Sequence, residues 1–108
     1  MDVSSRDGQP VLAALAEAAA RLSDATEAVI YRQDGDSLRL VARHGGRRSP
    51  SADTKPARAA RSTIQGRAIL DRVMIRIGAL IAAPMLRDGA TVGVILVRRG
   101  KARPFASA

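Results

Sequence analysis

The stretch that decides the fold reads AAPMLRDGATVGVILV and covers residues 82–97. Its second half, residues 91–97, has apolar side chains at both alternating positions, which is typical of a strand buried on both faces. Asp88-Gly89, just before it, is a frequent sequence for the turn of a β-hairpin. Pro84 places the preceding run at an edge, a bulge or a strand end. The stretch therefore predicts a hairpin whose second strand lies in the middle of a sheet.

A second hairpin is predicted earlier in the chain. Residues 27–33 and 37–43 are rich in β-forming side chains. Between them Asp34-Gly35-Asp36 is a turn sequence, and such a turn between two strand-like runs is a strong short-range hairpin signal. The first half of the chain therefore contributes two adjacent antiparallel strands.

Residues 72–77 form a further predicted strand, and Gly78 alone separates them from the apolar run 79–86. Glycine adopts backbone conformations that other residues avoid. The two runs can therefore form one long bent strand, a very tight hairpin, or an exchange of strands between two chains. The sequence leaves these three connections open.

The clearest predicted helix covers residues 10–23, where Pro10 fits the first turn. Its apolar residues recur at spacings of three and four, which is typical of one buried helical face. This predicted face consists of Val11, Leu12, Leu15, Ala18, Ala19 and Leu22.

Residues 45–62 are expected to form a loop, because they combine glycine, proline and serine. Ser62 or Thr63 is a suitable cap for a short helix over residues 64–71. In that helix the inward positions are Ile64, Ala68 and Ile69. The element order predicts an α+β fold, with a mostly antiparallel sheet of about five strands, an N-terminal helix and one short helix.

Four segments resemble a GAF domain, the small-molecule sensing and dimerising module of bacterial signalling proteins. Residues 24–31 resemble its first strand, residues 34–45 its first hairpin, residues 65–70 its short helix, and residues 82–95 its final hairpin. The resemblance implies one domain over residues 10–105, preceded by a flexible N-terminus at 1–9 and followed by a tail at 106–108.

Two departures from the family change what we expect. The excursion that closes over the family's ligand pocket is replaced by Gly78, and the family's C-terminal helix is represented only by residues 104–106. The signature of the cyclic-nucleotide variants and the cysteine of the bilin variants are also missing, so the identity of a ligand is open. Apolar surface left uncovered is typical of an interface. We therefore expect a homodimer whose interface contains Val11, Leu15, Ala18 and Leu22.

The net charge of +8 comes from 18 basic and 10 acidic residues, and 16 of the basic residues are arginine. Residues 43–67 hold seven basic residues against one acid, and residues 98–108 hold four against none. A basic loop and tail can bind a phosphate backbone, so the alternative is a module that binds nucleic acid or another anionic partner through residues 43–67 and 98–103. The candidate basic patch is Arg47, Arg48, Lys55, Arg58 and Arg61. A solvated arginine-rich loop explains the same residues.

Catalytic chemistry is not expected. The chain has no cysteine, which excludes disulfides, thiolate metal sites and a cysteine nucleophile. His44 is the single histidine and has no metal-ligand spacing around it. Residues 45–49 lack the pattern of a phosphate-binding loop, and no G-x-S-x-G motif occurs. We expect no enzyme activity, no metal and no cofactor.

The sequence thus predicts a non-enzymatic sensory or regulatory module of bacterial signal transduction, with small-molecule binding as an added expectation. Its partner would be a second copy or another signalling protein. A third alternative is a remnant dimerisation fragment of a sensor kinase or cyclase. Residues 1–10 lack a secretory signal pattern, and the apolar run 11–22 is interrupted by Glu17 and Arg21. We therefore expect a cytoplasmic location and no membrane partner.

Overall fold

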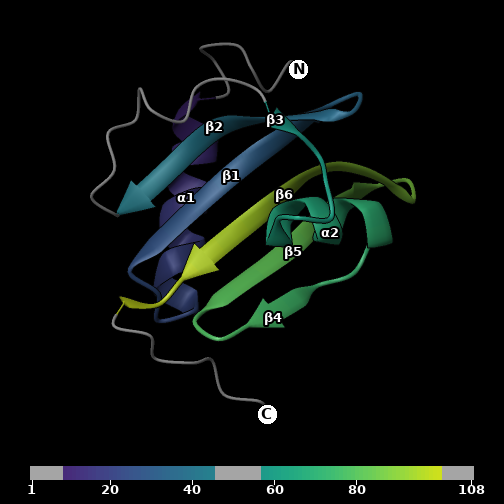
Figure 1. Cartoon of the computed structure of the whole chain (residues 1–108). Helices are drawn as coiled ribbons and strands as arrows, with labels where there is room; N and C mark the ends of the chain where they lie inside the picture. The colour runs from purple at the N-terminus through teal and green to yellow at the C-terminus, as the bar shows by residue number, and fades with distance from the viewer. Residues whose placement is uncertain (1–8, 46–56, 101–108) are drawn as a thin grey trace.

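The computed structural model describes residues 9–45 and 57–100, which form two helices and a sheet of six antiparallel strands (Figure 1). The elements are α1 (Gln9–Leu22), β1 (Glu27–Asp34), β2 (Ser37–Gly45), β3 (Ala57–Arg58), α2 (Ile64–Asp71), β4 (Ile75–Ile77), β5 (Leu80–Arg87) and β6 (Ala90–Arg98). The strand order is β3-β2-β1-β6-β5-β4. The α+β fold is confirmed, although these residues contain six strands rather than about five.

The two helices lie on opposite faces of the sheet. Figure 1 shows α1 behind the sheet and α2 in front of β5 and β6. We call these the α1 face and the α2 face. α1 packs mainly on β2 and β1, whereas α2 packs on β5 and β6. Each helix therefore covers a different half of the sheet.

The prediction of a central strand buried on both sides is confirmed. β6 lies between β1 and β5. Val97 and Ile95 belong to the cluster under α1, while Val94 and Leu96 belong to the cluster under α2. Because successive side chains of a strand point to opposite faces, β6 contributes to both halves of the core.

The connection at Gly78 is a very tight hairpin. Ile77 pairs with Leu80, so the turn contains only Gly78 and Ala79. Gly78 has φ +56°, which is the left-handed region that a two-residue hairpin of this kind needs at its first central position. The structure thus selects one of the three connections that the sequence left open.

α1 has two apolar faces, which corrects the prediction of a single one. Leu12, Ala16 and Ala20 are buried against the sheet, and Ala19 packs beside them. Val11, Leu15, Ala18 and Leu22 are exposed. The prediction placed Leu12 and Ala19 on one face with the exposed residues, but the sheet contacts Leu12 and the alanines, because alanine lets helix and sheet approach closely. The face that packs inside is therefore mostly alanine.

The short helix α2 has the predicted bounds. Thr63 is its cap, and the Thr63 hydroxyl accepts a hydrogen bond of 3.0 Å from the backbone N–H of Gly66. Ala68 and Ile69 are buried, and Ile64 packs against them. All three positions predicted to face inward therefore do so.

The predicted loop over residues 45–62 is interrupted by β3, which pairs with the start of β2. Ser37 lies opposite Arg58, and Leu38 lies opposite Ala57. A strand of two residues is too short to show an alternating pattern, so no local pattern indicates it. This short strand forms one edge of the sheet and leads the chain toward α2.

Gly66 makes the closest approach in α2. A Cβ atom placed on Gly66 would lie 1.9 Å from the carbonyl oxygen of Ala60. Replacing glycine by alanine inside a helix normally stabilises it by about 1 kcal/mol. Here we expect Gly66→Ala to destabilise the domain by about 1–3 kcal/mol, because the backbone of Ala60 has to move. Urea unfolding followed by circular dichroism measures the change.

The control for this variant is Gln65→Ala, one residue earlier in the same helix. It makes a small gain in helix propensity without the contact to Ala60, so we expect no loss of stability. An unfolding midpoint for Gly66→Ala at or above that of the unaltered chain would contradict the packing described here.

Candidate functional site

An ion cluster joins three neighbouring strands at one end of the sheet. The carboxylate of Glu27 accepts a hydrogen bond of 2.5 Å from Arg43 and lies 3.4 Å from the Arg98 guanidinium. The side chains of Glu27 and Arg43 are only 12% and 11% exposed, whereas that of Arg98 is 55% exposed. The cluster therefore fixes β1 against β2 and β6 and leaves one cation accessible to solvent.

Sequence reasoning missed this cluster. Glu27 and Arg98 lie directly opposite each other in the β1–β6 pairing, and Arg43 lies diagonally from Glu27 on β2. Residues that are 71 positions apart show no local pattern. Only the register of the two pairings would have brought them together.

The same end of the sheet contains the junction between α1 and β6. The Arg99 guanidinium donates two hydrogen bonds, of 3.1 and 3.3 Å, to the carbonyl oxygen of Ser23 just after α1. The backbone N–H of Arg99 donates to the carbonyl of Ala79 in the β4–β5 turn. The N–H and hydroxyl of Thr26 both donate to the Arg98 carbonyl. The exit from β6 is thereby fixed to the end of α1.

A small cavity of about 150 Å³ lies on the α2 face between the β1–β2 hairpin and α2. Its polar lining comes from Gln33, Asp36 and Arg58. The Thr91 hydroxyl donates a hydrogen bond of 2.5 Å to the Gln33 side chain. Ligand pockets usually measure about 300–1,000 Å³, so this cavity is too small for a typical metabolite.

A larger and shallower depression of about 410 Å³ follows the outside of α1. It is lined by Ala14, Glu17, Ala18, Arg21 and Leu22. Arg21 and Glu17 form an ion pair of 2.7 Å on this exposed surface. The hydrogen bond from Arg21, together with the charges of Arg21 and His44, lowers the pKa of the Glu17 carboxyl. The depression is an open helix surface rather than an enclosed site.

The predicted dimer residues therefore share one exposed surface. Val11 is 64% exposed, Leu15 is 40% exposed and Leu22 is 89% exposed. Ala18 lies among them on the same side of α1 and is also exposed. We call Val11, Leu15, Ala18 and Leu22 the outer stripe. Whether a second chain covers it stays a prediction.

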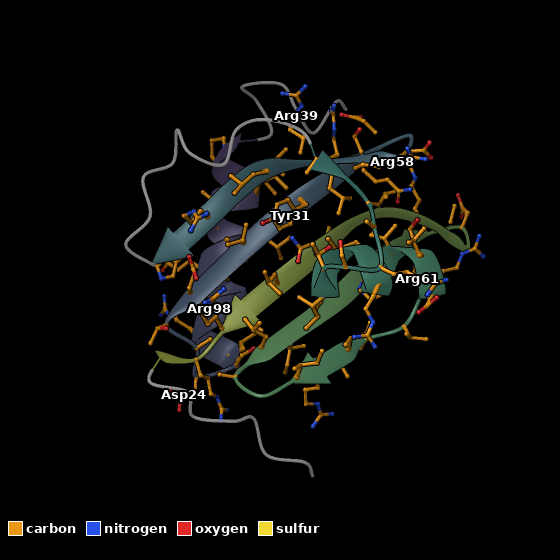
Figure 2. All side chains as sticks on the ribbon, viewed as in Figure 1. Asp24, Tyr31, Arg39, Arg58, Arg61 and Arg98 are labelled. Atoms are coloured by element: carbon orange, nitrogen blue, oxygen red, sulfur yellow. The ribbon has the colours of Figure 1, made fainter. Side chains whose placement is uncertain are left out.

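The predicted basic patch is only partly described. Arg47, Arg48 and Lys55 lie outside the described residues. Arg58 lines the small cavity together with Asp36, and Arg61 forms an ion pair of 2.6 Å with Asp71 (Figure 2). Of the two described members, Arg61 is thus paired with an acidic side chain, which weakens its attraction for a phosphate backbone.

Metal and membrane sites gain no support from the described ranges 9–45 and 57–100. His44 lies near the end of β2 opposite Ala28. Within these ranges no group of three His, Cys, Asp or Glu side chains could hold a metal ion. Neither helix there is long and apolar enough to cross a lipid bilayer.

Comparison with solved structures gives the fold a name. The GAF domain of an Acinetobacter phosphoenolpyruvate-protein phosphotransferase superposes with a TM-score of 0.79 at 13% identity, covering 92% of this chain and 70% of that chain. This chain has the GAF fold. The second GAF domain of DevS from Mycobacterium smegmatis gives a TM-score of 0.77 at 20% identity, covering 91% of this chain and 78% of that GAF domain. Identities this low show the fold alone.

One GAF-fold neighbour is an enzyme. The type II free methionine-R-sulfoxide reductase from Thermoplasma acidophilum gives a TM-score of 0.77 at 13% identity, covering 100% of this chain and 82% of that chain. The present chain contains no cysteine, so it has no thiol that could reduce a substrate or act as a nucleophile. No protein-family model and no curated protein matches the sequence.

The Glu27 cluster leads to a stability prediction. Removing one partner of a largely buried ion pair leaves the other charge uncompensated, at a cost of about 3 kcal/mol. We expect Glu27→Gln to destabilise the domain by that order, and Arg43→Met added to it to restore part of the loss. Chemical denaturation of the single and double variants measures both effects.

The matched control is Glu17→Gln, which removes the same charge from an exposed pair. An exposed ion pair on a helix contributes little, so this variant should unfold like the unaltered chain. Equal losses for Glu17→Gln and Glu27→Gln would show that the Glu27 cluster has no special structural role.

Proposed function

We propose that this GAF-fold domain is a non-enzymatic regulatory module of bacterial signal transduction that acts by subunit association through the outer stripe of α1. GAF domains from signalling proteins share its fold, which supports a regulatory role. We place the domain at residues 10–105, with residues 1–9 and 106–108 outside it. We propose that the protein acts in the cytoplasm. Its partner is a second copy or another signalling protein. A small molecule that regulates the association would bind outside the small cavity.

The observation that carries this proposal is the spacing of the outer stripe. Val11, Leu15, Ala18 and Leu22 follow one another at intervals of four, three and four residues. This spacing matches the seam of a two-helix coiled coil, in which apolar residues repeat every 3.5 residues on average. The side of α1 that contacts the sheet does not need these side chains, because Leu12, Ala16 and Ala20 already fill it.

The composition of the outer stripe suits close contact between helices. Ala18 is small and lies between Leu15 and Leu22, so a facing helix can insert a larger side chain there. Packed helices come within about 8–10 Å of each other. The Glu17–Arg21 pair borders the depression beside the stripe and stays at the polar rim of such an interface. A second copy of α1 therefore fits this surface in size and polarity.

The test compares the same substitution at two positions of α1. Ala18→Glu places a carboxylate in the outer stripe, whereas Ala13→Glu places one on an exposed part of the helix outside it. We expect the unaltered chain and Ala13→Glu to associate with rising concentration, and Ala18→Glu to remain monomeric. Sedimentation equilibrium over a range of protein concentrations measures this.

Circular dichroism spectra and thermal unfolding of both variants establish that each is folded. A mass that stays monomeric at every concentration for the unaltered chain would refute the proposal. Equal association of Ala18→Glu and Ala13→Glu would refute the assignment to the outer stripe.

A further inference from the structure

A second exposed apolar surface lies at the edge of the sheet that β4 forms. β4 is the outermost strand after β5, as Figure 1 shows. Val73 is 50% exposed, Met74 is 56% exposed and Ile77 is 49% exposed. With Arg76, which is also exposed, we call these four residues the β4 edge surface. Val73 and Met74 lie just before β4 and Ile77 ends it, so three large exposed apolar side chains occur within five positions of this edge.

We propose that the β4 edge surface binds an extended acidic segment of a partner protein, which adds a strand beside β4. Exposed sheet edges accept peptides in this way, since main-chain hydrogen bonds give affinity and alternate side chains give specificity. This surface is separate from the outer stripe of α1, so the proposal does not depend on subunit association.

The position of Arg76 argues against a second copy as the occupant. Arg76 is the middle residue of β4 and pairs with Ile81 of β5. If two copies of β4 paired antiparallel about their centres, Arg76 would lie directly opposite Arg76 of the other copy. Like charges at directly opposite positions destabilise a strand pair. A charge in the middle of an edge strand is also a known protection against edge-to-edge association.

The stretch of chain that contains β4 carries an excess of positive charge, which favours an acidic occupant. Residues 61–87 contain five arginines and one acid, a difference of +4. The one acid, Asp71, forms an ion pair with Arg61. The arginines are Arg61, Arg67, Arg72, Arg76 and Arg87. A partner segment with carboxylates therefore meets a complementary potential, which raises the association rate and selects against basic segments.

The alternation of β4 specifies the pattern of the partner segment. Ile75 packs in the cluster on the α2 face, and Ile77 shares that face because it lies two residues further along the strand. Arg76 points to the other face. A partner strand should therefore place an acidic residue opposite Arg76 and β-branched apolar residues opposite Ile75 and Ile77. The three central residues of the partner segment should therefore be apolar, acidic and apolar, in that order.

The test uses fluorescein-labelled peptides and the full chain. The probe is Ser-Thr-Val-Glu-Val-Thr-Ser. One comparison peptide has Lys in place of Glu, and another has Ser in place of both Val residues. We expect saturable binding of the probe by fluorescence anisotropy, and binding weaker by roughly tenfold or more for each comparison peptide.

Variants of the protein locate the binding. Arg76→Glu should abolish binding of the probe and allow binding of the lysine peptide, and Ile77→Ser should weaken the probe by roughly tenfold. The matched controls are Arg87→Glu, which makes the same charge change at the exposed end of β5, and Val11→Ser on α1. Val11→Ser should bind the probe like the unaltered chain, and Arg87→Glu should weaken the probe far less than Arg76→Glu does, because it lowers only the general positive potential. Circular dichroism establishes that each variant is folded.

Three results would overturn the proposal. Equal loss of probe binding in Arg76→Glu and Arg87→Glu would mean a general attraction of a basic protein for an acidic peptide. Equal binding of the serine-substituted peptide would mean that the apolar residues take no part. Competition by an unrelated polyanion such as duplex DNA at equal charge concentration would identify a nucleic-acid surface instead.

Discussion

The fold depends on the need to cover β6 on both faces. Its side chains alternate between two clusters, with Ile95 and Val97 toward α1 and Val94 and Leu96 toward α2. Burying an aliphatic side chain of this size contributes about 1.5–3 kcal/mol, while a whole domain is stable by only about 5–15 kcal/mol. A single helix could protect one face only. The second helix follows from this requirement.

The two helices cover the sheet unequally. Apolar surface stays exposed on the outside of α1 and at the β4 edge, where other chains can reach it. α1 uses its alanine-rich side against β1 and β2 and keeps larger side chains outside. α2 covers β5 and β6 but leaves the β4 edge exposed. The Glu27 cluster joins β1, β2 and β6, and the Arg99 contacts join β6 to the end of α1 and to the β4–β5 turn, so both outward surfaces belong to one connected core.

Local sequence patterns predicted the helices and strands well, but they predicted poorly which of these elements contact one another. Residues 91–97 indicated a central strand because both of their alternating positions are apolar, and Thr63 marked the start of α2. The two faces of α1 could not be separated, because its helical spacing fits either set of apolar residues and only the sheet shows which set is buried. β3 and the pairing of Glu27 with Arg98 depend on contacts between distant residues, which no local pattern reports.

In the proposed assembly, α1 is buried on one side by its own sheet and on the other by a second chain. The chain has no cysteine, so one cysteine introduced at a chosen position carries a single spin label. One variant is labelled at Ala14 beside the outer stripe, and another at Asp88 in the β5–β6 turn. Pulsed electron paramagnetic resonance then measures the distance between subunits. Because packed helix axes lie about 8–10 Å apart, we expect a narrow distribution of distances below roughly 25 Å between the Ala14 labels. The distances between the Asp88 labels should be longer. If the Ala14 label gave no intersubunit distance, or if the Asp88 label gave a shorter distance than the Ala14 label, α1 would not be the contact between subunits.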